Sequence, residues 1–129
     1  MSFILVPKRG DDVQINGWNW RPTLEFLLRS GLIDEDLYER MGAQGAGGEV
    51  DAELADHIAE AVERILKVMR PGERMLADLT VTRKPKSKWT ITPETRPDEL
   101  DTNDMYSATY EWLAEFASFC RRSGGFEVL

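Results

Sequence analysis

The sequence predicts an α+β fold, in which two long helices and one or two short helices pack on a small, mainly antiparallel sheet. Two patterns carry this prediction. Apolar residues recur at three- and four-residue spacing in the middle of the chain and near its end, as in amphipathic helices, whereas apolar and polar residues alternate over 77–82 and 89–92, as in half-buried strands. The chain has 129 residues, of which 42% are hydrophobic, so we expect a single domain, 1–129, whose core needs no disulfide or metal.

The first predicted elements are a strand and two helices. The segment 2–6 is apolar from Phe3 to Val6, has the length of a buried strand and is followed by a proline. A helix is predicted over 22–30, because proline is tolerated in the first helical turn and Gly31 provides a left-handed stop at the other end. Asp34 is the predicted N-cap of a shorter helix, 35–41.

The middle of the chain contains a glycine-rich segment and the clearest helix. Residues 42–48 hold four of the ten glycines, which predicts a flexible connector, and they lack the lysine and hydroxyl residue that end a phosphate-binding loop. Asp51 is the predicted N-cap of a helix that ends before Pro71. The apolar stripe of this helix is predicted to be core, and it consists of Leu54, Ile58, Ala61, Val62, Ile65, Leu66 and Met69.

The two alternating segments predict a β-hairpin. Residues 77–82 and 89–92 are its strands, and the tip between them carries four positive charges. A basic loop beside an aromatic ring is typical of nucleic-acid binding, so the 83–89 loop defines one function hypothesis. This hypothesis is the least favoured, because Trp89 alternates in phase with Ile91 and is therefore predicted to face the core.

The last predicted helix spans 102–122. Asp101 is its expected N-cap, and Asp104 completes a capping box. Its apolar stripe is so broad that we expect it to be packed on more than one side. The two glycines at 124–125 end the helix, and 126–129 is expected to return as a strand or to pin the terminus to the core.

The residues with the most versatile chemistry do not form a catalytic set. His57 is the only histidine, and its neighbours Glu53, Asp56 and Glu60 are typical of an acidic helix face, without the ligand spacing of a metal site. Cys120 is the only cysteine and lies within an apolar helical stripe. The sequence therefore predicts no catalytic residue, no metal and no cofactor.

Negative charge is concentrated in one segment. The whole chain carries a net charge of -7, whereas 34–63 alone has ten acidic residues against one arginine. Such a segment repels nucleic acid and attracts a basic protein partner. Our first function hypothesis is therefore a non-enzymatic protein-binding or regulatory module, for example an immunity-type inhibitor, with Asp51, Asp56 and Glu60 as candidate binding residues. The alternative is a solvated surface that keeps the protein soluble.

A second candidate surface lies at the start of the 22–30 helix. Trp18, Trp20 and Arg21 bring two large rings and a guanidinium together, which is the composition of many binding hot spots. The alternative is that one or both tryptophans cap the core. This cluster supports a second function hypothesis, namely a small ligand-binding domain or enzyme that uses carboxylates with His57, Trp20 and Arg21 in one pocket.

Both ends of the chain carry short motifs. Near the N-terminus stands Asn19-Trp-Arg-Pro22, followed by Leu24-Glu-Phe26, and the chain closes with Phe116-Ala-Ser-Phe119 and Ser123-Gly-Gly-Phe-Glu127. In these motifs the chain resembles a group of small uncharacterised bacterial and phage-associated proteins. The resemblance covers about a quarter of the chain and implies a cytoplasmic prokaryotic origin. No activity is assigned to that group, so the resemblance lends no functional residue.

The sequence also bears on location. No apolar run approaches the ~20 residues that a membrane-spanning helix needs. The N-terminus has neither the basic region nor the small-residue cleavage site of a signal peptide. We therefore expect a cytoplasmic protein that does not enter a membrane.

Overall fold

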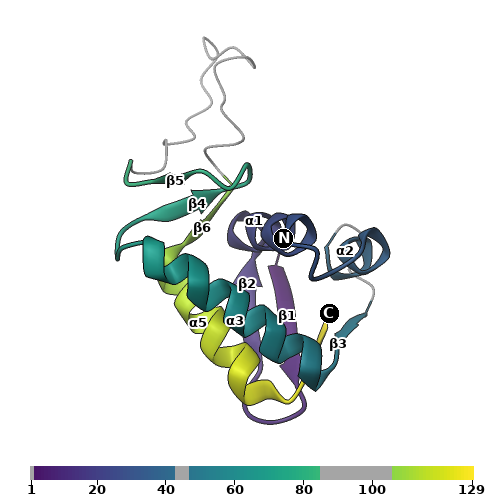
Figure 1. Ribbon diagram of the computed structural model, residues 1–129. Helices are drawn as coiled ribbons and strands as arrows, with labels where there is room; N and C mark the ends of the chain where they lie inside the picture. The colour runs from purple at the N-terminus through teal and green to yellow at the C-terminus, as the bar shows by residue number, and fades with distance from the viewer. Residues whose placement is uncertain (1, 43–46, 85–105) are drawn as a thin grey trace.

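The computed structural model describes residues 2–42, 47–84 and 106–129, and within them the chain forms four helices and two antiparallel sheets (Figure 1). The predicted α+β class is confirmed. The helices are α1 Gly17–Arg29, α2 Glu35–Met41, α3 Ala52–Val68 and α5 Tyr110–Ser123. The strands are β1 Ser2–Pro7, β2 Val13–Asn16, β3 Gly48–Val50, β4 Arg74–Leu76, β5 Val81–Thr82, β6 Ser107–Thr109 and β7 Phe126–Val128.

The four-stranded sheet has the strand order β2-β1-β7-β3. The predicted N-terminal strand is β1, and the C-terminal segment does return as a strand, β7, which lies between β1 and β3. The register places Leu5 opposite Val128 and Val50 opposite Phe126, and all four side chains are buried. Ile4, which points to the other face, is 40% exposed. One face of this sheet therefore carries the core.

The glycine-rich connector is predicted over 42–48, but only its two ends can be compared with the structure. Residues 43–46 lie outside the described part of the chain. Gly48 begins β3, a strand that the sequence does not predict, and a Cβ atom there would lie 2.5 Å from Cγ of Met41. The end of α2 thus crosses the start of β3 too closely for a side chain.

The prediction of a strand over 77–82 is wrong for residues 77–80, which form the turn of a hairpin between β4 and β5. The N–H of Leu76 donates to the carbonyl of Thr80 at 2.8 Å, and the N–H of Thr80 donates to Oδ1 of Asp78 at 3.0 Å. The alternation of apolar and polar residues over 77–80 therefore belongs to a turn that the Asp78 side chain helps to close. The predicted strand 89–92 and most of the 83–89 loop lie outside the described residues, so that hypothesis stays a prediction.

The predicted helix 22–30 is α1, but α1 begins at Gly17 rather than at Pro22. Asn16 is its N-cap, and the Oδ1 atom of Asn16 accepts a hydrogen bond from the N–H of Asn19 at 3.0 Å. Pro22 therefore lies inside the helix, where it supplies no N–H for the helical ladder. Taking the proline as the start of the helix overlooks both the asparagine cap and the short strand β2. The predicted stop at Gly31 is confirmed by its φ of +74°.

The helices α2 and α3 agree with the prediction. Oδ1 of Asp34 accepts from the N–H of Leu37, and Oδ1 of Asp51 accepts from the N–H of Leu54, each at 2.8 Å. Figure 1 shows α3 lying alongside α5 across the sheet. The predicted stripe of α3 faces inward: Ile58, Val62 and Met69 are buried, and Leu54, Ala61, Ile65 and Leu66 are partly buried. No helix in the described parts of the chain is long and apolar enough to cross a membrane.

The prediction that the last helix starts at 102 is wrong, because α5 begins at Tyr110. Its N-cap is Thr109, whose Oγ1 atom accepts from the N–H of Trp112 at 3.0 Å. The residues just before it, 107–109, pair with β4 as strand β6, which makes the second sheet in the order β5-β4-β6. This long-range pairing replaces a helical turn that the local sequence allows. The proposed caps Asp101 and Asp104 lie outside the described residues.

The centre of the core is an aromatic cluster around Trp20, whose side chain is 0% exposed. The ring centroid of Trp20 lies 5.5 Å from that of Phe116, 6.3 Å from that of Trp112 and 6.4 Å from that of Phe3. Its Nε1–H donates to the carbonyl of Met41 at 2.8 Å. The cluster joins α1, α5, β1 and the end of α2. Because α5 also packs along α3, it is packed on more than one side, as predicted.

Candidate functional site

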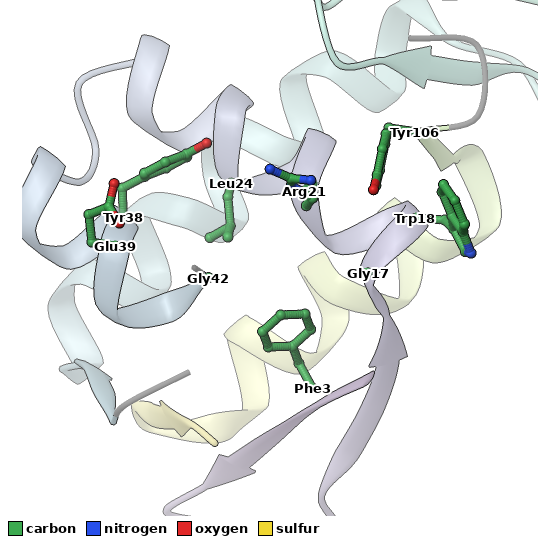
Figure 2. A pocket seen from close by; sticks show the side chains of 9 residues that line it. All are labelled: Phe3, Gly17, Trp18, Arg21, Leu24, Tyr38, Glu39, Gly42 and Tyr106. Carbon is green, nitrogen blue, oxygen red and sulfur yellow. The ribbon is translucent and has the colours of Figure 1, made fainter. Parts of the chain in front are cut away.

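A pocket of about 530 Å³ lies between α1 and α2, with β1 at its base and the residue before β6 at its edge (Figure 2). This volume falls within the range of small-molecule sites. The pocket is lined by Phe3, Gly17, Trp18, Arg21, Leu24, Tyr38, Glu39, Gly42 and Tyr106. Most of these side chains are aromatic or aliphatic, and two of them carry opposite charges.

One wall of the pocket is a stack of three side chains. Figure 2 shows Tyr106 between Trp18 and Arg21. The ring centroids of Trp18 and Tyr106 are 4.6 Å apart, and the guanidinium carbon of Arg21 lies 5.0 Å from the Tyr106 centroid, which is a cation–π distance. Oδ1 of Asn19 accepts from the N–H of Thr109 at 3.0 Å and so ties α1 to β6. This bond holds the two sides of the stack together.

The opposite wall is formed by α2. The hydroxyl of Tyr38 donates to Oε1 of Glu25 at 2.6 Å, and Glu25 also pairs with Arg29 at 3.5 Å. Burial raises the pKa of Tyr38 to about 12, and the hydrogen bond to Glu25 and the negative charge of that carboxylate add to the effect. Tyr38 therefore stays protonated at neutral pH and presents its ring to the pocket. Glu39 lies beside it and is exposed.

Replacing Glu25 with glutamine is expected to lower the pKa of Tyr38 from about 12 toward its ordinary value of 10.0, without reaching it, because burial remains. A tyrosine that ionises less readily in the folded state stabilises the fold at pH below 10.0, and this contribution is lost as the pH rises through about 12. This loss of stability at high pH should be smaller in Glu25→Gln than in the unchanged protein. Tyrosinate absorbance, measured with Tyr106 and Tyr110 replaced by phenylalanine, reports the pKa. An unchanged pKa would contradict the role of Glu25.

The floor of the pocket is apolar and closely packed. Phe3 from β1 and Leu24 from α1 are 6% and 2% exposed, so they belong to the core and form the bottom of the pocket. Gly42, at the end of α2, comes close to Leu24, since a Cβ atom at Gly42 would lie 2.8 Å from Cδ1 of Leu24. Any side chain at position 42 would push into this floor.

The two tryptophans of the predicted hot spot have different positions. Trp18 is half-buried and lines the pocket, and Arg21 is exposed at the same wall. Trp20 is fully buried at the centre of the core, so it is a core residue and no surface contact. Its neighbours in sequence point elsewhere because successive residues of a helix are rotated by about 100° around the helix axis.

The predicted acidic binding residues lie at the start of α3 and along it, away from the pocket lining. The carboxylate of Asp51 caps the helix through the N–H of Leu54. Asp56 and Glu60 are exposed, and Glu60 lies 3.9 Å from Arg64. All three acidic residues are accessible, and Asp51 and Glu60 already have partners within the protein.

The acidic segment 34–63 extends over several elements, and some of its carboxylates have partners within the protein. Figure 1 shows that its residues are distributed over α2, β3 and α3. Three of its carboxylates are paired with arginines, in the pairs Asp36–Arg40, Glu60–Arg64 and Glu63–Arg121. The Arg121 partner lies on α5, and its hydrogen bond lowers the pKa of Glu63. These three carboxylates of the segment therefore already have a cationic partner within the protein.

His57 and Cys120 do not join the pocket. His57 is exposed on α3, and neither His57 nor Trp20 lines the pocket. The second hypothesis placed these two residues in one pocket with Arg21, but only Arg21 lines this pocket. Cys120 is 1% exposed, and burial raises the pKa of its thiol. Among the residues that the structure describes, no group of three or more His, Cys, Asp or Glu side chains is arranged to hold a metal ion.

Of the nine lining residues, the sequence predicts Trp18 and Arg21 as binding residues and does not indicate the other seven, among them Phe3, Tyr38, Glu39 and Tyr106. The local patterns assign Phe3 to a strand, Tyr106 to the last helix, and Tyr38 and Glu39 to a short amphipathic helix. Tyr106 is far from Trp18 in the chain, so no local pattern links the two rings. The one sequence signal that points to an additional aromatic surface is the number of large aromatic residues, which is greater than one helix face can bury.

Comparison of the chain with protein-family models, with curated proteins and with solved structures finds no match. The resemblance to small bacterial and phage-associated proteins therefore stays a prediction.

Proposed function

We propose that this chain is a non-enzymatic binding protein whose pocket between α1 and α2 receives an aromatic or apolar group of its ligand. The observation that supports the proposal is the stack of Trp18, Tyr106 and Arg21, which forms a pocket wall. The other large rings described above, such as Trp20 and Phe116, are buried in the core. Aromatic and arginine side chains that remain accessible beside a pocket are typical of binding hot spots.

The chemistry of the lining favours binding over catalysis. The titratable side chains that line the pocket are those of Arg21, Tyr38, Glu39 and Tyr106. Arginine stays protonated, and the raised pKa of Tyr38 makes this hydroxyl a poor proton donor and its anion scarce at neutral pH. Among the described lining residues, the hydroxyl that pairs with a carboxylate is that of Tyr38, and its raised pKa keeps it protonated, so the lining favours recognition of a ligand over attack on it.

A nuclear magnetic resonance titration tests the proposal. We would titrate four probes that share a benzene ring: 3-phenylpropan-1-ol, 3-phenylpropionate, phenethylamine and L-phenylalanine. At least one is expected to shift the indole N–H signal of Trp18 with a dissociation constant of about 1 mM or lower, and Trp18→Ala should abolish its binding. Arg64→Gln, on α3, is the matched control. Absence of any shift at Trp18 in the folded protein, with all four probes, contradicts the proposal.

A basic protein partner is the second candidate function. The supporting observation is that Glu53, Asp56 and Glu60 are exposed and lie at three- and four-residue spacing on α3. A ten-residue lysine-rich peptide is a suitable probe. Its affinity should fall as salt is raised and should fall further in Asp56→Lys, with Glu115→Lys on α5 as the control. An affinity that does not change with salt would exclude the acidic surface.

A further inference from the structure

The guanidinium of Arg21 is the charged group of the α1 wall. Arg21 and Leu24 are three residues apart on α1, so both project from the same face of the helix, and both line the pocket. Figure 2 shows the Arg21 side chain between Leu24 and Tyr106. Glu39, the other charged residue of the lining, belongs to α2 and lies on a different side of the pocket. A ligand group beside Arg21 and Leu24 therefore meets a positive charge.

The aromatic rings beside Arg21 hold its guanidinium in place. The guanidinium carbon lies 5.0 Å from the centroid of the Tyr106 ring, and Trp18 packs against the same ring with its centroid 4.6 Å away. A guanidinium that lies over a ring keeps its N–H groups in its own plane, where they can still donate. Because the group is positioned before a ligand arrives, less conformational entropy is lost when the ligand binds.

The N–H groups of Arg21 are available to a ligand. The side chain is exposed, and within the described parts of the chain it makes no salt bridge and no hydrogen bond. The other arginines of α1 and α2 are paired with carboxylates of their own helices, Arg29 with Glu25 and Arg40 with Asp36. Arg21 differs from both, since its contact is with a ring.

We propose that the ligand of this pocket is an aromatic carboxylate. Its carboxylate accepts hydrogen bonds from the guanidinium of Arg21, and its ring packs on the apolar floor of Phe3 and Leu24. The planar fork of arginine donors matches the two oxygens of a carboxylate, and charge-assisted hydrogen bonds are about twice as strong as neutral ones. This inference rests on the proposed function and adds the charge of the ligand to it.

Other charges fit the α1 wall less well. An ammonium group there meets the like charge of Arg21, and a neutral group leaves the guanidinium without a charged partner. Tyr106 lies between Trp18 and Arg21, so its faces are already covered and offer a ligand cation little room. A ligand cation would pair with Glu39 on α2 instead, and the variant Glu39→Gln separates the two cases.

The four benzene-ring probes test the inference, because they share the ring and differ in charge. The titration of the Trp18 signal is expected to give 3-phenylpropionate an affinity about tenfold higher than that of the neutral 3-phenylpropan-1-ol. Phenethylamine should bind most weakly, and L-phenylalanine more weakly than 3-phenylpropionate, since its ammonium is next to its carboxylate. The preference for 3-phenylpropionate should shrink as salt is raised, because Arg21 is exposed.

Arg21→Gln should abolish this preference while changing the affinity for 3-phenylpropan-1-ol little, and Arg21→Lys should retain part of it, since it keeps the charge. Glu39→Gln should not weaken the binding of 3-phenylpropionate. Arg64→Gln on α3 is the matched control, because it removes the same charge from an exposed residue that does not line the pocket. Thermal unfolding of every variant verifies that it is folded.

Three results would overturn the inference and leave the proposed function standing. In the first, 3-phenylpropan-1-ol binds as tightly as 3-phenylpropionate. In the second, phenethylamine binds best and Glu39→Gln removes its binding, so the ligand is a cation. In the third, 3-phenylpropionate binds best, but Arg21→Gln affects it no more than Arg64→Gln does. If no probe binds, the proposed function fails together with the inference.

Discussion

Replacing Trp20 with alanine is expected to lower the free energy of unfolding by about 4 kcal/mol. The side chain is 0% exposed and packs against Phe116, Trp112 and Phe3, so its removal leaves a large cavity among rigid rings. The loss also leaves the carbonyl of Met41 without the hydrogen bond that it accepts from the indole N–H. Urea unfolding, followed by circular dichroism, measures the effect.

Two further variants separate the causes. Trp20→Phe retains most of the ring packing and removes the hydrogen bond to Met41, so it should cost about 1–3 kcal/mol. Trp18→Ala is the matched control, because Trp18 is half-buried at the pocket, and it should cost less than Trp20→Ala. If Trp18→Ala destabilises the protein as much as Trp20→Ala, the assignment of one ring to the core and the other to the pocket is wrong.

Replacing Gly125 with alanine is expected to lower the free energy of unfolding by about 3 kcal/mol. Gly125 lies between α5 and β7 with a φ of +107°, a backbone conformation that residues with a side chain rarely adopt. In addition, a Cβ atom there would lie 2.8 Å from the carbonyl oxygen of Val50 and 3.2 Å from the nitrogen of Ala52. These neighbours are backbone atoms where β3 passes into α3, so they cannot move aside as a side chain would.

Gly72→Ala is the matched control for this prediction. Gly72 has a φ of +89°, but no atom lies within 4 Å of the position that an alanine Cβ would occupy, so this variant reports the backbone strain without the crowding. We expect it to cost about 1 kcal/mol. Thermal and urea unfolding of both variants give the comparison. Equal losses for the two variants would show that the close approach of β3 and α3 at Gly125 has no energetic weight.

The pocket changes which surface is the better candidate for a binding site. From charge alone, the acidic segment 34–63 is the leading candidate, and the aromatic cluster near the N-terminus is second. In the structure the acidic residues are dispersed over three elements and partly paired, whereas Trp18 and Arg21 gain Tyr106, Tyr38 and Phe3 as neighbours around a cavity. The ligand-binding hypothesis therefore becomes the leading one, with different residues from those that the sequence suggests for it.

Elements whose ends carry local signals are predicted well. Asp34 and Asp51 have carboxylates that accept hydrogen bonds from N–H groups three residues later, and the helices that follow them begin where predicted. Gly31 and Gly124 end their helices in the left-handed conformation, which glycine adopts at no steric cost. In these cases the stabilising contact lies within a few residues of the element, so the neighbouring sequence contains the necessary information.

Elements that depend on distant partners are predicted poorly. The segment 107–109 is a strand because β4 pairs with it, and 77–80 is a turn because the hairpin brings β5 back to β4. The start of α1 is an intermediate case. Asn16 is a local N-cap signal, but the prediction gave more weight to Pro22 and therefore began the helix too late. Where local preferences are nearly balanced, hydrogen bonds to a distant strand decide the conformation.

The amino-acid sequence is sufficient to specify the α+β class, the cores of α2 and α3, the N-terminal strand, and the presence of an aromatic and arginine cluster. It is not sufficient to separate Trp18 from Trp20, because the direction of a helical side chain depends on where the helix begins and on what packs against it. Nor does it contain the pocket, whose residues come from β1, α1, α2 and the position before β6. Only the folded chain brings these segments together, since their contacts are stabilised by burial that no short stretch of sequence achieves alone.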